Sequence, residues 1–173
     1  MRAFLFAALL VACGPKPHAP DPISNTGGTP TGAHELLASI ERTACFGWCP
    51  IYKLTVYRDG SVEYDGEDFV KTKGKAEGHL APEQLSALDD LFQQRDYFGL
   101  HDEYNDYSVT DMPSVNTSYS SGGKTKKIAH YLGDSHAPKE LGEIEEGIDR
   151  IVKIEQWIGT EQERENLANH RSP

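Results

Sequence analysis

Three cysteines, Cys13, Cys45 and Cys49, are the residues whose type and spacing point most directly to chemistry. Cys45 and Cys49 enclose three residues, and the central one, Gly47, supplies the backbone freedom that brings two sulfurs together. In an exported chain such thiols persist as disulfides, so the sequence predicts a Cys45–Cys49 disulfide. A redox pair or a metal site is the alternative, although the spacing is C-x3-C and neither C-x2-C nor the haem signature C-x2-C-H occurs.

The N-terminus supports export. Arg2 precedes an apolar run over residues 3–12, which is about half of the roughly 20 residues that a membrane span requires. Residues 1–12 are therefore predicted to be a signal peptide. The segment Leu10-Val11-Ala12-Cys13 resembles the bacterial lipobox, which implies cleavage before Cys13 and lipid attached to it. An ordinary signal peptide is the alternative.

The lipid expected on Cys13 predicts where the mature protein is located. Several acyl chains on Cys13 exceed the two-signal threshold for stable anchoring, so the mature protein is expected to be tethered to the membrane without spanning it. The residue after Cys13 is Gly14, not the aspartate that signals inner-membrane retention in the best-known bacteria. By this resemblance, the predicted location is the bacterial cell envelope, on the periplasmic face of the outer membrane.

Composition divides the chain after the predicted signal peptide into three parts. Residues 13–34 are rich in Pro, Gly, Ser and Thr and are predicted to form a flexible linker with a reach of about 25 Å. Residues 35–159 are predicted to form a single domain, and residues 160–173 a polar tail that is frayed or weakly helical. The net charge of −10, from 17 basic and 27 acidic residues, argues against nucleic acid as a partner.

Two hairpins are predicted. Asp59-Gly60 separates two β-prone runs, and a three-residue loop with a left-handed Gly60 places the apolar residues on one face, which a two-residue loop does not. The second hairpin turns at Gly122-Gly123. The pairs expected across the two hairpins are Leu54–Tyr64, Val56–Val62, Thr117–Ile128 and Val115–His130.

The predicted fold class is α+β. Apolar residues repeat at helical spacing over 82–95 and 138–155, each range beginning at a proline, and the lysine-rich segment 69–80 fits an edge strand. Trp157 is expected to pack at the end of the second helix. An antiparallel sheet of about five strands, from two hairpins and an edge strand, is therefore expected to carry two helices on one face. Residues 36–40 fit either a helical turn or the lead-in to a strand.

The loop 101–111 is the most polar part of the predicted domain. Its carboxylates and amides could hold Ca²⁺, but the D-x-[DN]-x-[DN]-G spacing is absent, and a solvated loop with Asp or Asn turns is the other interpretation. We predict no cofactor and no metal site.

The pattern E-R-T-A-C-F-G-W-C-P-I-Y, followed by Y-R-D-G-S-V-E-Y-D-G, V-T-D-M-P-S and W-I-G, resembles a family of bacterial lipoprotein domains of unknown function. The resemblance spans roughly residues 37–159, and C-F-G-x-C-P-x-Y is its most specific part. It implies a single domain in the cell envelope and supplies no activity. Trp48 occupies the position that this motif leaves open.

Two classes of function follow. The first is a non-catalytic binding or structural module with an envelope-protein or cell-wall partner, for which Trp48 and Phe46 are the candidate binding residues because aromatic rings on a short clamped loop suit an interface. Trp48 could instead pack as an outlying core residue. The second class is an envelope hydrolase whose catalytic groups are dispersed, for example His130 or His136 beside Asp134 and Ser135. No catalytic motif occurs, so the sequence favours the first class.

Overall fold

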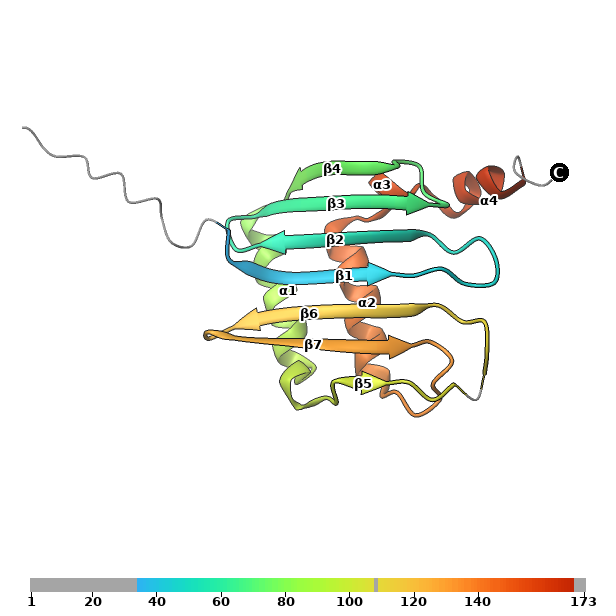
Figure 1. Ribbon diagram of the computed structural model, residues 1–173. Helices are drawn as coiled ribbons and strands as arrows, with labels where there is room; N and C mark the ends of the chain where they lie inside the picture. The colour runs from blue at the N-terminus through green and yellow to red at the C-terminus, as the bar shows by residue number, and fades with distance from the viewer. Residues whose placement is uncertain (1–33, 108, 170–173) are drawn as a thin grey trace, which may run out of the picture.

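A computed structural model describes residues 34–107 and 109–169. It contains one open sheet with the strand order β4-β3-β2-β1-β6-β7-β5, and helices cover one face of the sheet (Figure 1). The predicted signal peptide and almost all of the predicted linker lie outside the described residues. The strands are β1 Leu36–Arg42, β2 Ile51–Tyr57, β3 Ser61–Asp68, β4 Gly74–His79, β5 Glu103–Tyr104, β6 Ser114–Ser121 and β7 Lys124–Tyr131.

Both predicted hairpins are confirmed in register. In β2–β3, Leu54 lies opposite Tyr64 and Val56 opposite Val62, and Gly60 has φ 90°, the left-handed conformation that the three-residue loop requires. In β6–β7, the two glycines of the turn have positive φ and the predicted partners face each other. The predicted edge strand is also present, as β4 beside β3.

The sheet differs from the prediction in two ways. It has seven strands rather than about five, because residues 36–42 form β1 at its centre and residues 103–104 add β5 at one edge. It is also not wholly antiparallel, since β5 runs parallel to β7. Strand β1 pairs with β2 on one side and with β6 on the other, so it joins the two hairpins into one sheet. These pairings are long-range, and local sequence patterns do not encode them.

The two long helices are α1, Pro82–Gln94, and α2, Lys139–Val152, and both lie behind the sheet in Figure 1. Their apolar stripes face the sheet, as predicted. Helix α2 ends earlier than expected, because Lys153 is left-handed and the Ile154 amide donates to the Asp149 carbonyl oxygen at 2.9 Å. The two helices approach closely at Gly147, where a Cβ atom would lie 2.5 Å from Leu91 Cδ2.

Trp157, in the short helix α3 (Glu155–Ile158), completes the core under β3 and β4. Its ring stacks on Tyr64 with a centroid distance of 5.3 Å, and a Cβ atom on Gly78 would lie 2.8 Å from it. Trp157 thus packs against the sheet and not only at the end of α2. Burial raises the pKa of the Tyr64 hydroxyl to about 12.

The polar tail is helical over α4, Glu161–Asn169, and residues 170–173 lie outside the described part. Thr160 and Glu163 form a capping box: the Glu163 amide donates to Thr160 Oγ1 at 3.3 Å, and the Thr160 amide donates to Glu163 Oε2 at 2.8 Å. Lys71 pairs with Glu163 at 3.0 Å, so the helix is also attached to the β3–β4 loop.

Candidate interaction surface

Exposed apolar side chains gather in loops at one end of the sheet. Figure 1 shows that the β1–β2 loop and the β5–β6 loop both emerge at this end. Together they carry most of the large hydrophobic side chains that are exposed in the described part of the chain. We call these residues the loop-end surface: Phe46, Trp48, Tyr107, Val109 and Met112.

The disulfide loop carries two residues of the loop-end surface, Phe46 and Trp48. Cys45 and Cys49 are bonded, with 5.8 Å between their Cα atoms, so the predicted disulfide is present. The Gly47 amide donates to the Cys45 carbonyl oxygen at 2.9 Å. A loop closed this tightly has few backbone conformations, so the positions from which Phe46 and Trp48 project are restricted.

The disulfide loop is also fixed to the neighbouring β5–β6 loop. The Phe46 amide donates to the Asp111 carbonyl oxygen at 3.2 Å. At the base of the two loops, the Thr43 amide donates to the Ser114 carbonyl oxygen at 3.0 Å, and the Ser114 amide donates to Thr43 Oγ1 at 2.8 Å. The two loops therefore form one backbone-linked unit.

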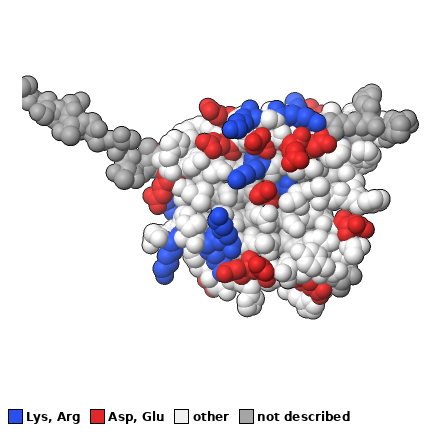
Figure 2. All heavy atoms as spheres, viewed as in Figure 1, with Lys and Arg blue, Asp and Glu red and all other residues white. Residues whose placement is uncertain are grey.

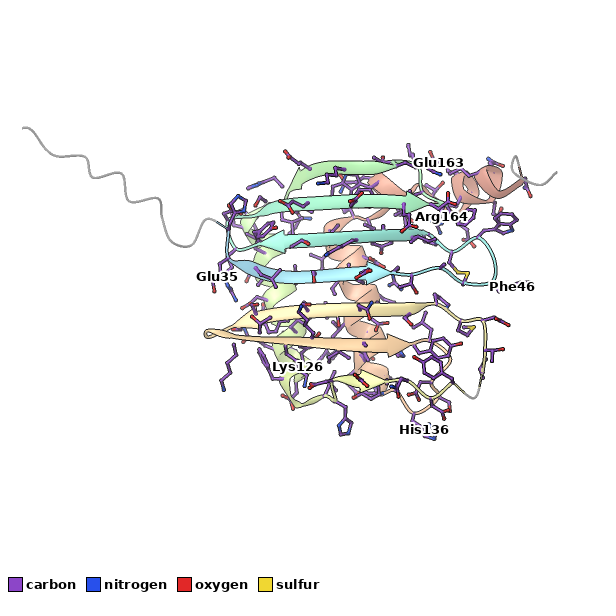
Figure 3. The ribbon with its side chains drawn as sticks, viewed as in Figure 1. Glu35, Phe46, Lys126, His136, Glu163 and Arg164 are labelled. Carbon is purple, nitrogen blue, oxygen red and sulfur yellow. A yellow bond between two sulfur atoms is a disulfide. The ribbon has the colours of Figure 1, made fainter. Side chains whose placement is uncertain are left out.

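The two candidate binding residues differ in their surroundings. Phe46 is 91% exposed and points away from the sheet at the edge of the molecule (Figure 3). Trp48 is 51% exposed and meets the ring of Phe69 edge-on, with 5.2 Å between ring centroids. Trp48 is thus half exposed to solvent, packs against Phe69 of the β3–β4 loop, and does not belong to the core.

Three members of the loop-end surface were missed by the sequence analysis: Tyr107, Val109 and Met112. Tyr107 packs on Tyr131 with 4.6 Å between ring centroids, and the Met112 amide donates to the Tyr131 hydroxyl at 3.1 Å. The one signal available was their occurrence as isolated apolar residues in a polar segment. Isolated exposed apolar residues are common, so this signal was weak without the contacts.

The histidines of the predicted hydrolase arrangement lie in different environments. His130 is buried between β7 and α2, where its Nδ1 lies 2.7 Å from Glu145 Oε1. The side chain of His136 is 78% exposed, and its Nδ1 lies 3.5 Å from Asp134 Oδ1 and 3.4 Å from Asp106 Oδ2. Asp134 and His136 therefore meet, as the alternative function requires, whereas His130 is engaged with Glu145.

Asp106, Asp134 and His136 each offer one ligand atom, and these atoms lie within 4.8 Å of one another. Asp134 is already satisfied by the loop itself, since it accepts the Asp106 amide at 3.0 Å and the His136 amide at 2.8 Å. These backbone hydrogen bonds, the Asp106 amide first, lower the pKa of Asp134. Asp134 thus forms an Asp turn with His136 and links the 101–111 loop to the segment after β7 through the Asp106 amide.

Arg42, Tyr52 and Asp149 form a polar cluster that joins the sheet to α2 and that the sequence analysis did not predict. Arg42 Nη2 and Asp149 Oδ2 lie 2.7 Å apart, and the Tyr52 hydroxyl donates to Asp149 Oδ1 at 2.6 Å. Burial works against the charge of Arg42, but the charge of Asp149 and the interactions with Tyr52 together outweigh it and raise the pKa of the guanidinium. Burial, then the charge of Asp149, raises the pKa of Tyr52. Asp149 is 107 positions from Arg42 and 97 from Tyr52, so only the fold reveals its contact with them.

Comparisons with known proteins show the family to which the domain belongs. Within residues 34–107 and 109–169, no helix has the length and apolar character that crossing a membrane requires. No curated protein matches the chain. Residues 37–152 match a family described as a domain of unknown function (DUF6438), and this match covers more than half of the chain. The chain therefore belongs to the DUF6438 family.

Proposed function

We propose that this protein is a lipoprotein of the bacterial cell envelope, anchored through lipid on Cys13, and that its domain binds a protein partner through the loop-end surface. The single observation that carries the binding role is the set of exposed aromatic and aliphatic side chains on loops that a disulfide and backbone hydrogen bonds hold together. Aromatic side chains on rigid loops are common anchors of protein interfaces, because they bury much area at little entropic cost.

The position of this surface suits a tethered protein. The described chain enters the domain beside Glu35, at the end of the sheet opposite Phe46 (Figure 3). Strand β1 connects these ends directly, and its seven residues span about 23 Å at the usual strand rise. A lipid-anchored linker would therefore hold one end of the domain and leave the loop-end surface at the far end. The partner expected there has an apolar pocket for Phe46 and Trp48.

Cys13→Ala tests the anchor. The variant should leave the membrane fraction while the domain stays folded, since Cys13 precedes β1, the first described strand, by 23 residues in the sequence. Circular dichroism of the soluble variant checks the fold. Persistence of Cys13→Ala in the membrane pellet would contradict the lipoprotein assignment.

The binding role is tested by affinity capture of the lipidated protein from envelope extracts, with Phe46→Ala/Trp48→Ala as the variant. Phe98 offers a matched control, because it is an exposed aromatic residue (41%) outside the loop-end surface. A partner that is captured by the wild type and by Phe98→Ala, but not by the double variant, supports the proposal. A capture pattern that is the same for all three proteins refutes it.

The second candidate function is an envelope hydrolase, favoured by the contact between Asp134 and His136. It is tested with His136→Ala in assays of ester, amide and glycosidic substrates from the envelope. Hydrolysis by the wild type that His136→Ala abolishes would establish this alternative over a purely binding module.

A further inference from the structure

The sheet face that no described helix covers carries a second feature, separate from the loop-end surface. Figure 2 views the molecule from this face, and charged side chains gather over β2, β3 and β4, whereas the surface beside them carries fewer charges. This distribution of charge follows from the residues that face outward in two rows, each of which runs across the sheet through the paired positions of neighbouring strands. One row is Glu103–Ala129–Asn116–Glu41–Lys53–Asp65–Lys75, and the next is Lys127–Ser118–Ser39–Thr55–Glu63–Glu77.

Short side chains occupy consecutive positions in each row, Ala129–Asn116 in the first and Ser118–Ser39–Thr55 in the second, and longer side chains flank them. The result is a shallow hollow of about 580 Å³ over β1, β6 and β7. Its floor consists of small, mostly polar residues: Ser39, Thr55, Asn116, Ser118 and Ala129. Its rim includes Glu41 and Lys53 on one side and Glu103 and Lys127 on the other.

The polar groups of the hollow are available to a ligand. Within the described residues, the hydroxyls of Ser39 and Thr55 and the amide of Asn116 make no side-chain hydrogen bond. Lys53 and Lys127 likewise have no carboxylate within 4.0 Å in the described part of the chain. The neighbouring Lys126 differs, since it pairs with Asp102 at 2.7 Å.

We propose that this hollow binds the glycan–peptide polymer of the bacterial cell wall. Hydroxyl and amide groups that can both donate and accept hydrogen bonds match the hydroxyls and amides of amino sugars. The two lysines, set on opposite sides of the floor, match carboxylates, and Glu41 and Glu103 match amines, both of which the peptide stems carry. A polyanion such as nucleic acid is disfavoured because carboxylates line the same rim and the chain has a net charge of −10.

This inference rests on the proposed envelope location but not on the loop-end surface. A membrane-anchored protein that binds the cell wall through its sheet face and a protein partner through its loops would connect that partner to the cell wall. Since the hollow and the loop-end surface share no residue, substitutions can separate the two activities.

The test is co-sedimentation of the purified full chain, carrying Cys13→Ala to keep it soluble, with isolated peptidoglycan sacculi. Lys53→Glu and Lys127→Glu should each weaken binding about tenfold, and Ser39→Tyr should abolish it by filling the floor. Lys75→Glu is the matched control, because Lys75 lies in the same row as Lys53 but does not line the hollow. Thermal melts establish that the four variants are folded.

Three results would overturn the proposal: no sedimentation of the Cys13→Ala protein that carries no further substitution, an equal loss in Lys75→Glu and Lys53→Glu, or a loss confined to Phe46→Ala/Trp48→Ala. The last result would move cell-wall binding to the loop-end surface. Because the assay contains no membrane, its failure is distinct from a failure of the lipid anchor, which fractionation of Cys13→Ala measures separately.

Discussion

The amide of Phe46 donates a 3.2 Å hydrogen bond to the carbonyl oxygen of Asp111, and this bond joins the disulfide loop to the β5–β6 loop. Residues more than sixty positions apart in sequence thereby share one rigid support. The loop-end surface draws on both loops, since Phe46 and Trp48 lie in the first and Tyr107, Val109 and Met112 in the second.

Removal of the disulfide by Cys45→Ala/Cys49→Ala should lower the free energy of unfolding by about 2 kcal/mol. The physical reason is the short loop that the bond closes, whose entropy in the unfolded chain the bond restricts. Urea denaturation of the wild type and the double variant measures the difference. Alkylation of the unreduced protein, followed by mass spectrometry, should label neither Cys45 nor Cys49, and labelling of both would contradict the disulfide.

The two tryptophans should respond differently to truncation. Trp48 is 51% exposed, so Trp48→Ala should cost about 1 kcal/mol of stability, and Phe46→Ala should cost less than about 0.5 kcal/mol. Trp157 is 7% exposed, so Trp157→Ala should cost about 3 kcal/mol or more. Chemical denaturation compares the three variants. A cost for Trp48→Ala as large as that for Trp157→Ala would place Trp48 in the core and remove it from the binding surface.

Asp149→Ala should destabilise the domain by about 2 kcal/mol, because it removes the acceptor of Arg42 Nη2 and of the Tyr52 hydroxyl. We expect a value below that of a fully buried ion pair, since the side chains of Arg42 and Asp149 are 20% and 19% exposed. Lys139→Ala, which removes the exposed Lys139–Glu143 pair, is the control and should change stability by less than about 0.5 kcal/mol. Equal effects of Asp149→Ala and Lys139→Ala in equilibrium denaturation would show that the Arg42–Tyr52–Asp149 cluster stabilises the domain no more than an exposed ion pair does.

Two glycines of α2 should give opposite results when changed to alanine. Gly142 has no atom within 4 Å of the added Cβ, so Gly142→Ala should stabilise the protein by about 0.5–1 kcal/mol through helix propensity. At Gly147 the Cβ atom would meet Leu91 Cδ2 at 2.5 Å, so Gly147→Ala should destabilise by about 1–3 kcal/mol. Thermal unfolding measures both variants, and stabilisation by Gly147→Ala would contradict the close helix packing described above.

The start of α4 should melt in acid. Hydrogen bonds from the Thr160 amide, then from Lys71, lower the pKa of Glu163 from 4.5 to about 2. A carboxyl group with a lowered pKa in the folded state stabilises the fold above its ordinary pKa, so the contribution of Glu163 is full above about pH 4.5 and disappears as the pH falls towards 2. NMR chemical shifts of residues 160–164 across this range measure the loss. Glu163→Gln should flatten the pH dependence, and a dependence that persists in Glu163→Gln would assign it to another group.

The sequence by itself determined the local features of the domain. Turn residues and alternation fixed both hairpin registers, and prolines with a helical apolar repeat marked the starts of α1 and α2, since these signals act over a few neighbouring residues. The five-residue span of Cys45 and Cys49 likewise allowed their disulfide to be predicted.

Only the tertiary structure decided how these pieces join. The pairing of β1 with both β2 and β6, the parallel edge strand β5 and the contact of Arg42 with Asp149 depend on chain segments that are distant in sequence. The loop-end surface and the hollow over β1, β6 and β7 are of the same kind, because each collects residues from several strands or loops whose proximity exists only after the sheet has formed.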